Sequence, residues 1–361
     1  RSAPIADTNG SSARPSAHRR PALRIAAVPN ADPLSHAILD AIDEPALIVG
    51  GRMVLAANQA AKKLLGTAIE DRDLRFAIRH PLALDTILAG QPADLELIGI
   101  GSAERPWNLS VRAVPGGGTL VRLSDRSALR AAERMRTDFV ANASHELRTP
   151  LATIIGYAET LCEDGPVDDE TRGRFGATIE TEARRMLRIV EDLMSLSRIE
   201  ADRYRMPDEN VDIGEVARIA IEQLTAISER RGCRIETEID DNVPILKGDF
   251  GQLLQLADNL IGNAIRYGCN EKNCGVEVRI AVDGHRILFS VRDRGEGIAA
   301  EHLPRLTERF YRIDSARSRE SGGTGLGLAI VKHIVERHRG ELRIDSTPGH
   351  GTEVTVALPG I

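Results

Sequence analysis

The chain has 361 residues, of which 42% are hydrophobic and 28% charged, and its formal net charge is −6. This composition allows a packed core and argues against global disorder, while the length predicts two or three domains. The negative charge and an aromatic share of 3% argue against nucleic acid as the main partner, because nucleic-acid binders present basic surfaces and stacking aromatics.

The N-terminal stretch, residues 1–33, mixes Ser, Pro, Gly and Arg without periodicity, and we expect it to be a flexible segment. The sequence contains no run of about 18 apolar residues, so it predicts no membrane-spanning helix. The chain starts with Arg1 rather than Met, and the arginines between positions 14 and 24 would suit the cytoplasmic flank of a membrane anchor further upstream. We therefore expect a cytoplasmic fragment of a protein attached to the inner membrane, although a solvated linker explains these arginines about as well.

Residues 34–125 alternate helical and strand patterns. A short helix, a strand, a turn at Gly50 and Gly51, a second strand and a helix are expected up to Gly66. The segments "ADLELIGI", "PWNLSVRAV" and "GTLVRLSD" then alternate apolar and polar residues, as three antiparallel strands do. This pattern predicts a small α+β domain that resembles a PAS sensor domain, and the alternative is a dimerising spacer without a ligand.

Residues 126–206 predict a helical hairpin. The first helix should run from Ser127 to about Glu163 and the second from Asp168 or Asp169 to about Arg203, with Gly165 and Pro166 between them. Both helices carry apolar residues at heptad spacing: Leu147, Leu151, Ile154, Ala158 and Leu161 in the first, and Ile179, Met186 and Leu193 in the second. Two helices cannot cover both seams, so we expect a homodimeric four-helix bundle.

Residues 207–361 mix helices and strands. Helices are expected over Ile213–Arg231, Asp249–Tyr267 and Leu326–Arg339, with five strands distributed around them. Such a pattern predicts a two-layer α/β sandwich with the helices on one face.

Four cysteines occur in the chain, at positions 162, 233, 269 and 274. Cys269 and Cys274 are close in sequence, but no second Cys or His pair completes a zinc site near them. We expect free thiols, as in a reducing cytoplasm. The segment "GCNEKNCG" that holds this pair has no assigned role.

The stretch "FVANASHELRTP" places His145 and Glu146 side by side in the first hairpin helix, with Pro150 shortly after. An imidazole is a usable nucleophile, and an adjacent carboxylate could hold its Nδ1 proton and leave Nε2 free. Pro150 cannot donate to the carbonyl of Glu146, so a bend is expected near His145. The combination predicts a phosphoryl-acceptor site. Thr149 lies one turn further on the same face, where it could orient a water molecule or merely belong to the bend.

The C-terminal part carries a second group of polar residues. "DNLIGNAIRY" places Asn259 and Asn263 one turn apart on one helix, where two asparagines indicate a polar pocket. The side-chain carbonyl of Asn263 could bind Mg²⁺, which prefers oxygen ligands. Arg266 and Tyr267 follow within a turn, in reach of phosphate oxygens.

Two glycine-rich segments complete this group. In "DRGEG", Asp293 closes a strand and could accept the adenine amine, while Gly295 and Gly297 let the backbone pass close to a flat ring. In "GGTGLGLAIVKHIVERH", Gly323, Gly325 and Gly327 lead into a helix N-terminus, which is suited to phosphates. The spacing fits neither a Walker loop nor a dinucleotide-binding fingerprint.

Five motifs in a fixed order resemble the H, N, G1, F and G2 boxes of sensor histidine kinases. They are "SHELRTP", "DNLIGNAIRY", "DRGEG", "ERFYR" and "GGTGLGLAIVKHI". The resemblance covers about residues 127–358 and looks closest to the phosphate-regulon (PhoR-like) sensor kinases. It implies a dimeric phosphotransfer hairpin followed by an ATP-binding sandwich of the Bergerat (GHKL) type.

The resemblance also implies residue roles. His145 matches the phosphorylated histidine, Glu146 the carboxylate that assists it, and Thr149 the residue that helps to dephosphorylate the partner response regulator. Asn263 matches the Mg²⁺ ligand. The residues that match nucleotide-binding positions are Asn259, Asn263, Arg266, Tyr267, Asp293, Gly295, Gly297, Phe310, Arg312, Gly323, Gly325 and Gly327.

The implied activity is ATP-dependent autophosphorylation of His145, followed by transfer to an aspartate of a response regulator, with phosphatase activity toward that regulator. Phosphate starvation is the stimulus that the subfamily implies. Two alternatives remain open. A GHKL-type ATPase would turn over ATP without forming phosphohistidine, and a non-catalytic dimeric scaffold would not bind Mg-ATP.

Overall fold

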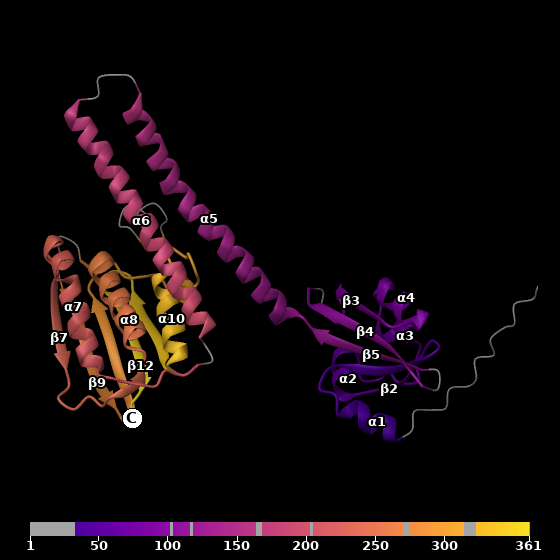
Figure 1. Cartoon of the computed structure of the whole chain (residues 1–361). Helices are drawn as coiled ribbons and strands as arrows, with labels where there is room; N and C mark the ends of the chain where they lie inside the picture. Colours follow the sequence, from indigo (N-terminus) through magenta and orange to yellow (C-terminus); the bar gives the residue numbers. More distant parts are fainter. Residues whose placement is uncertain are drawn as a thin grey trace, which may run out of the picture. The chain divides into compact units, whose positions relative to one another are not determined.

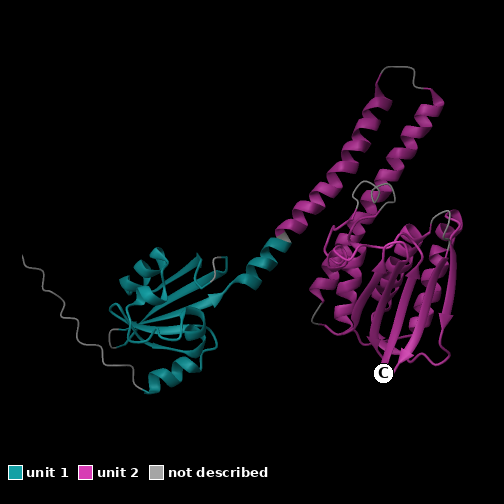
Figure 2. Ribbon diagram, turned by 180° about the vertical axis from the view of Figure 1, so that it is seen from behind, with its two compact units in different colours: residues 1–136 teal, residues 137–361 magenta. Residues whose placement is uncertain are grey.

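The computed structural model describes residues 33–101, 104–115, 118–163, 168–202, 205–269, 275–313 and 323–360. The expected flexible segment, residues 1–33, therefore lies outside the described residues except for residue 33. Gly322 of the glycine-rich motif and Cys274 also lie outside them. The chain divides into two compact units, residues 1–136 and 137–361, and the division falls within one long helix (Figure 2). Among the helices of the described ranges, none combines the length and apolarity that a membrane span requires.

The first unit is a five-stranded antiparallel sheet with helices around it (Figure 1). Its elements are α1 (Pro33–Asp40), β1 (Ala46–Gly50), β2 (Met53–Ala57), α2 (Gln59–Leu65), α3 (Leu74–Ala77), α4 (Pro81–Ala89), β3 (Ala93–Ile98), β4 (Pro106–Val114) and β5 (Gly118–Asp125). The strand order is β2-β1-β5-β4-β3. The predicted helices and strands of this part are present, and α3 and α4 are additional. Leu47, Leu109 and Leu123 are fully buried in the core.

Asn58 is a buried polar residue that holds this unit together. It caps α2 by accepting the N–H of Ala61, and its Oδ1 also accepts the N–H of Ala46. Its Nδ2 donates to the carbonyls of Leu39, Ile42 and Glu44. Because all of its hydrogen-bonding groups are engaged within the fold, its role is structural.

The hairpin consists of α5 (Ser127–Cys162) and α6 (Asp169–Ala201). Asp168 caps α6 by accepting the N–H of Thr171 at 2.8 Å, as expected from the sequence. α5 continues as one helix through Pro150, so the expected bend does not interrupt it.

The second unit continues into a five-stranded sheet in the order β11-β12-β10-β9-β7, covered on one face by helices (Figure 1). Its elements after the hairpin are β6 (Glu209–Val211), α7 (Ile213–Arg230), β7 (Arg234–Ile239), β8 (Leu246–Gly248), α8 (Phe250–Asn263), η1 (Ala264–Gly268), β9 (Gly275–Asp283), β10 (Arg286–Asp293), η2 (Leu303–Arg305), α10 (Gly327–Arg337), β11 (Glu341–Thr347) and β12 (Gly351–Pro359). β7 and β9 pair in parallel and the other neighbours are antiparallel.

The sandwich has the predicted helices and strands with two differences. β6 and β8 form a separate two-stranded sheet that periodicity did not predict, because three-residue strands carry too short a pattern. The single helix expected up to Tyr267 ends at Asn263 and passes into η1, a π-helical turn. π-helical turns inside helices are common at functional sites.

Candidate functional site

His145 is exposed on α5, so its ring is accessible to a reacting partner. Thr149 is also exposed, and its Oγ1 donates to the carbonyl oxygen of His145 at 3.4 Å. The two predicted residues therefore lie one helical turn apart on the same exposed face.

Glu146 faces a different direction from His145, because neighbouring residues of a helix are rotated by about 100°. Its Oε2 lies 3.1 Å from Nη2 of Arg185 on α6 and 3.3 Å from Nη2 of Arg312. The structure thus gives Glu146 arginine partners, whereas the sequence predicted only its neighbour His145.

Asp293, the predicted adenine acceptor, is half-buried at the end of β10. Its Oδ1 accepts the N–H of Gly295 at 2.8 Å and the N–H of Thr352 at 3.2 Å. Burial raises the pKa of this carboxyl. The two N–H donors partly offset this rise, because they stabilise the charged form. A Cβ on Gly268 would lie 2.2 Å from Cβ of Asp293, so the end of η1 packs directly on this carboxylate.

Two glycines after Asp293 permit close backbone contacts. Gly297 has φ +67°, and a Cβ there would lie 2.0 Å from the carbonyl oxygen of Thr347. A Cβ on Gly295 would lie 2.7 Å from the carbonyl oxygen of Tyr267. Larger residues would push these segments apart, so both glycines set the shape of the site.

Asn259 and Asn263 lie half-buried on α8, as predicted. Oδ1 of Asn263 accepts from Nη1 of Arg266 at 3.2 Å, so the predicted cation ligand is an arginine acceptor in this structure. Gly327 begins α10, and a Cβ there would lie 2.6 Å from Oδ1 of Asn259. Tyr267 is 48% exposed beside the Arg266 guanidinium.

Phe310 and Gly325 contact each other, and the residues 314–322 between them in sequence lie outside the described ranges. The N–H of Phe310 donates to the carbonyl of Gly325 at 2.8 Å, and both residues have positive φ, +64° and +73°. A Cβ on Gly325 would lie 2.9 Å from Cα of Phe310, so glycine is needed there. Arg312 donates to the carbonyl of Gly323, which is buried.

Residues on both sides of this segment contact the hairpin. Oγ1 of Thr324 donates to Asp192 on α6 at 2.7 Å, and burial raises the pKa of Asp192. Before the segment, Arg309 pairs with Glu200 of α6, and the rings of Phe139 and Phe310 lie 6.0 Å apart. Together with the Arg312–Glu146 pair, these contacts hold the hairpin against the predicted nucleotide site.

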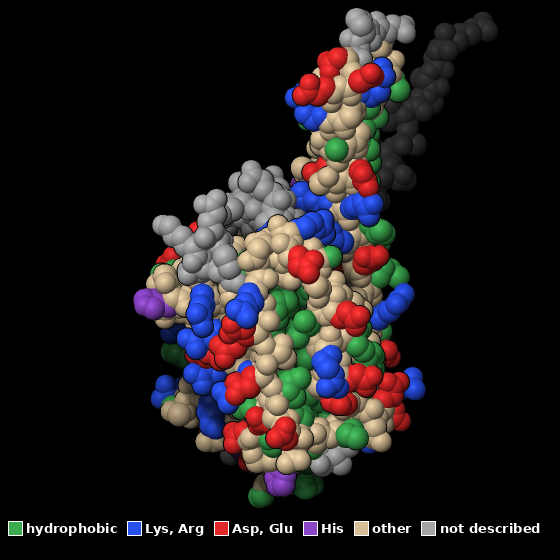
Figure 3. Space-filling model, turned by 90° about the vertical axis from the view of Figure 1, so that its left-hand side faces the viewer, with side chains coloured by type: hydrophobic (Ala, Val, Ile, Leu, Met, Phe, Trp, Pro, Cys, Tyr) green, Lys and Arg blue, Asp and Glu red, His purple; other side chains and the backbone are tan. Residues whose placement is uncertain are grey.

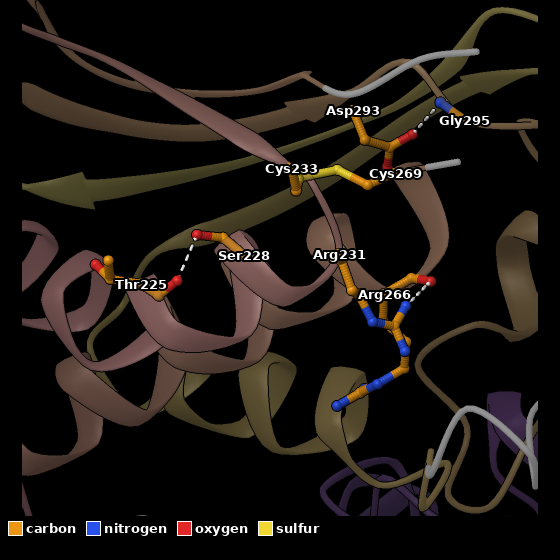
Figure 4. The surroundings of a disulfide bond; sticks show 8 residues. All are labelled: Thr225, Ser228, Arg231, Cys233, Arg266, Cys269, Asp293 and Gly295. Carbon is orange, nitrogen blue, oxygen red and sulfur yellow. Dashed lines mark hydrogen bonds between the residues drawn. A yellow bond between two sulfur atoms is a disulfide. The ribbon is translucent and has the colours of Figure 1, made fainter. Parts of the chain in front are cut away.

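Cys233 and Cys269 form a disulfide bond behind this site (Figure 4). The prediction of free thiols is therefore wrong for these two cysteines, whereas Cys162 is free and exposed. Cys269 directly follows Gly268, which packs on Asp293, and the nearby Arg231 donates to the carbonyl of Arg266 at 2.8 Å. Cys233 and Cys269 are 36 residues apart, so the sequence gave no signal that they pair. Only the fold brings the residues that follow α7 and η1 together.

Sequence reasoning missed two residues of this region. Thr352 contributes only a backbone N–H to Asp293, which no side-chain motif can reveal. Arg185 does have a signal, since it lies four residues before the buried Ile189 on the same face of α6. An arginine in an apolar stripe requires a partner, and here Glu146 supplies it.

Two family models match this chain. Residues 135–202 match the "His Kinase A (phospho-acceptor) domain", and residues 248–360 match the "Histidine kinase-, DNA gyrase B-, and HSP90-like ATPase" domain. These matches coincide with the hairpin that holds His145 and with the sandwich that holds Asp293. The chain belongs to the sensor histidine kinases.

Within that family it is similar to the phosphate regulon sensor protein PhoR of Pseudomonas aeruginosa, with 40% identity over 236 residues, covering 65% of this chain and 53% of that protein. The sensor-like histidine kinase SenX3 of Mycolicibacterium smegmatis is 37% identical over 241 residues, covering 66% of this chain and 62% of that protein. The chain thus spans between half and two thirds of the length of these relatives. A crystal structure of full-length ShkA in complex with AMPPNP matches 62% of this chain and 46% of that one, with 30% identity and a TM-score of 0.46.

Proposed function

We propose that the chain autophosphorylates His145 from ATP and passes the phosphoryl group to an aspartate of a response regulator. One observation supports this most: a single compact unit contains both an exposed histidine on α5 and the sandwich. The half-buried carboxylate of the sandwich, Asp293, is suited to accept an adenine amine.

ATP would bind between α8, the end of β10 and the start of α10. Asp293 can accept the adenine amine, and the backbone from Gly323 to Gly327 leads into the N-terminus of α10, where N–H groups favour phosphates. Asn259 borders this backbone, while Arg266 and Tyr267 follow on η1.

The residues present also fit Mg²⁺. Oδ1 of Asn263 is a carbonyl oxygen, the ligand type that Mg²⁺ prefers, and it is already engaged by the cation of Arg266. A bound Mg²⁺ would neutralise charge on the transferring phosphoryl group. Arg266 would then be released toward the phosphates.

In the transfer step the lone pair of Nε2 of His145 forms a bond to the γ-phosphorus, the bond between this phosphorus and its bridging oxygen breaks, and ADP leaves with that electron pair. Arg312 and Arg266 would offset the charge of the transferring group. Arg312 contacts Glu146 in the present structure, so the sandwich must shift against the hairpin to bring phosphate to His145.

Thr149 would serve the reverse reaction on the regulator, by orienting water toward its phosphoaspartate. Its exposed position one turn from His145 supports this role, because both residues would meet the same docked receiver domain.

A homodimer would cover the apolar surface of the hairpin. Figure 3 shows hydrophobic side chains between charged ones along this part of the second unit. The large exposed apolar residues of the hairpin include Val140, Leu151, Ile155, Leu187, Val190 and Met194. A second copy would pair with these residues to form a four-helix bundle.

The first unit would be a PAS-like sensor domain, as its five-stranded antiparallel sheet and flanking helices suggest, with α5 as the lever to His145. The similarity to PhoR supports phosphate starvation as the stimulus. We also propose that the protein is attached to the inner membrane and that these residues lie in the cytoplasm. Nucleic acid is not proposed as a partner.

The test is incubation of the chain with Mg²⁺ and γ-labelled ATP, followed by acid and base treatment. We expect an acid-labile, base-stable label that His145→Gln abolishes and that a purified receiver domain removes. ATP hydrolysis without any phosphohistidine would instead favour the ATPase alternative.

A further inference from the structure

One carboxylate in this structure serves two buried arginines. Nη2 of Arg185 and Nη2 of Arg312 lie 3.1 Å and 3.3 Å from the same oxygen of Glu146. Both arginine side chains are only 7% exposed, whereas that of Glu146 is 28% exposed. The roles proposed above account for Arg312 and Glu146 but give none to Arg185.

The two arginines differ in what holds them in place. Arg185 belongs to α6, the helix paired with α5 in the hairpin, so the fold of the hairpin keeps it beside Glu146. Arg312 belongs to the sandwich and lies next to the segment 314–322. If phosphoryl transfer requires the sandwich to shift, Arg312 leaves Glu146 and Arg185 stays.

The charges around Glu146 favour the departure of Arg312 while Arg185 stays. A buried guanidinium without a counter-charge is costly, so each arginine needs a carboxylate nearby. Glu182, the other acid near Arg185, has its Oε2 3.8 Å from Nη1 of Arg185, further than Glu146. Both guanidinium groups face the same carboxylate oxygen of Glu146, so Arg185 weakens the attraction that Glu146 exerts on Arg312.

We infer that Arg185 is a positioning residue for autophosphorylation. It holds Glu146 in place on α5 and offsets its charge, so that Arg312 can exchange Glu146 for the phosphate of the nucleotide. This inference rests on the proposed kinase function. Without Arg185, Glu146 would bind Arg312 alone and more tightly, and the sandwich would remain in its present arrangement.

A salt bridge that only pins α5 to α6 would show the same contacts, so the test must separate the two roles. A double-mutant cycle first shows whether Arg185 acts through Glu146, because such a residue has no effect once Glu146 is changed. A purely structural salt bridge would also pass this cycle, so the kcat-against-KM split and the hydrogen exchange of residues 309–312 separate the two roles. The cycle uses the full chain with Arg185→Met, Glu146→Gln and both changes together. Arg184→Met is the matched control, because Arg184 is the preceding residue of α6, 74% exposed and paired with Glu180.

Initial rates of autophosphorylation are measured over a range of Mg-ATP concentrations. We expect Arg185→Met to lower kcat by about tenfold while KM changes less than about twofold, because the nucleotide site itself is intact. Arg184→Met should stay within about twofold of the wild type. In the Glu146→Gln background, Arg185→Met should cost less than about twofold more. Equal losses in both backgrounds, or equal effects of the two arginine changes, would overturn the inference.

Arg185→Lys keeps the positive charge and guards against a variant that fails to fold. It should retain kcat to within about threefold of the wild type. If its urea midpoint equals that of the wild type but its kcat falls as far as that of Arg185→Met, a charge-based role is contradicted.

Amide hydrogen exchange gives a readout that does not depend on kinase activity. In Arg185→Met the N–H groups of residues 309–312 should exchange about threefold more slowly, because Arg312 is held more tightly by Glu146. Unchanged exchange there overturns the inference. A wild-type chain that takes up no label refutes the kinase proposal instead, so the two failures are distinguishable.

Discussion

The hairpin and the sandwich of the second unit expose their proposed reactive groups to different degrees. His145 stands exposed on α5, whereas Asp293 is half-buried under backbone N–H groups and against Gly268. A phosphoryl acceptor must meet two large partners in turn, the nucleotide domain and a receiver, so it has to be accessible. A carboxylate that recognises adenine works best away from water, where its hydrogen bonds are stronger.

This difference predicts how each region tolerates change. The residues proposed to react in the hairpin lie on a helix surface and can be altered without disturbing a core. The residues of the sandwich site are also part of its packing, so changes there should affect stability and binding together.

The largest effect should come from reducing the disulfide. Breaking the bond between Cys233 and Cys269, which spans 36 residues, should lower the free energy of unfolding of the sandwich by roughly 2–4 kcal/mol. Urea titrations with and without reductant, on a chain with Cys162→Ser, measure this. Hydrogen exchange should rise in β7 and η1 but not in α5, and uniform loosening of both regions would break the comparison.

The matched control carries Cys233→Ser and Cys269→Ser as well. Its urea midpoint should not respond to reductant, and a response would show that another thiol is responsible.

The second effect concerns Asp293. Asp293→Asn removes the charge of the predicted adenine acceptor and should weaken ATP binding by about 10- to 100-fold, the range expected when a hydrogen bond to a charged group is lost. Isothermal titration calorimetry measures the dissociation constant. Asp283→Asn, at the exposed end of β9, is the control and should leave it unchanged.

His145→Gln is the corresponding test in the hairpin. Because His145 is exposed, the variant should bind ATP like the wild type, and its free energy of unfolding should stay within about 0.5 kcal/mol. A large loss of stability would mean that the histidine is part of the packing after all.

The smallest effect is a pH dependence of the sandwich. The ring of His338 is buried, and its Nε2 accepts the N–H of Asp249 at 3.0 Å, so its Nδ1 carries the proton and donates to the carbonyl of Ile334 at 2.8 Å. Burial lowers the pKa of His338 below its ordinary value, so the unfolded chain takes up a proton more readily. The free energy of unfolding should therefore be fully maintained above about pH 6.5 and fall below it, by at most about 1.4 kcal/mol per pH unit.

Urea unfolding at several pH values checks this slope. His338→Asn should make the dependence shallower, while the exposed His350→Gln should not. An identical slope in the His338 variant would assign the effect to other groups.

Much of this protein could be predicted from local patterns. The order of helices and strands follows from hydrophobic periodicity. The five boxes predict His145, Asn263 and Asp293 as site residues, because each motif is a short, contiguous segment. Exposure of His145 follows in the same way, since it lies off the apolar seam of α5.

Other features required the tertiary structure, because they join residues that no local pattern connects. The π-helical end of α8, the disulfide between Cys233 and Cys269, and the N–H that Thr352 donates to Asp293 all depend on how segments meet in the sandwich. The partners of Glu146 are the clearest case. Its neighbour in sequence is His145, but a helix turns adjacent side chains apart, and packing against α6 and the sandwich brings Arg185 and Arg312 to it instead.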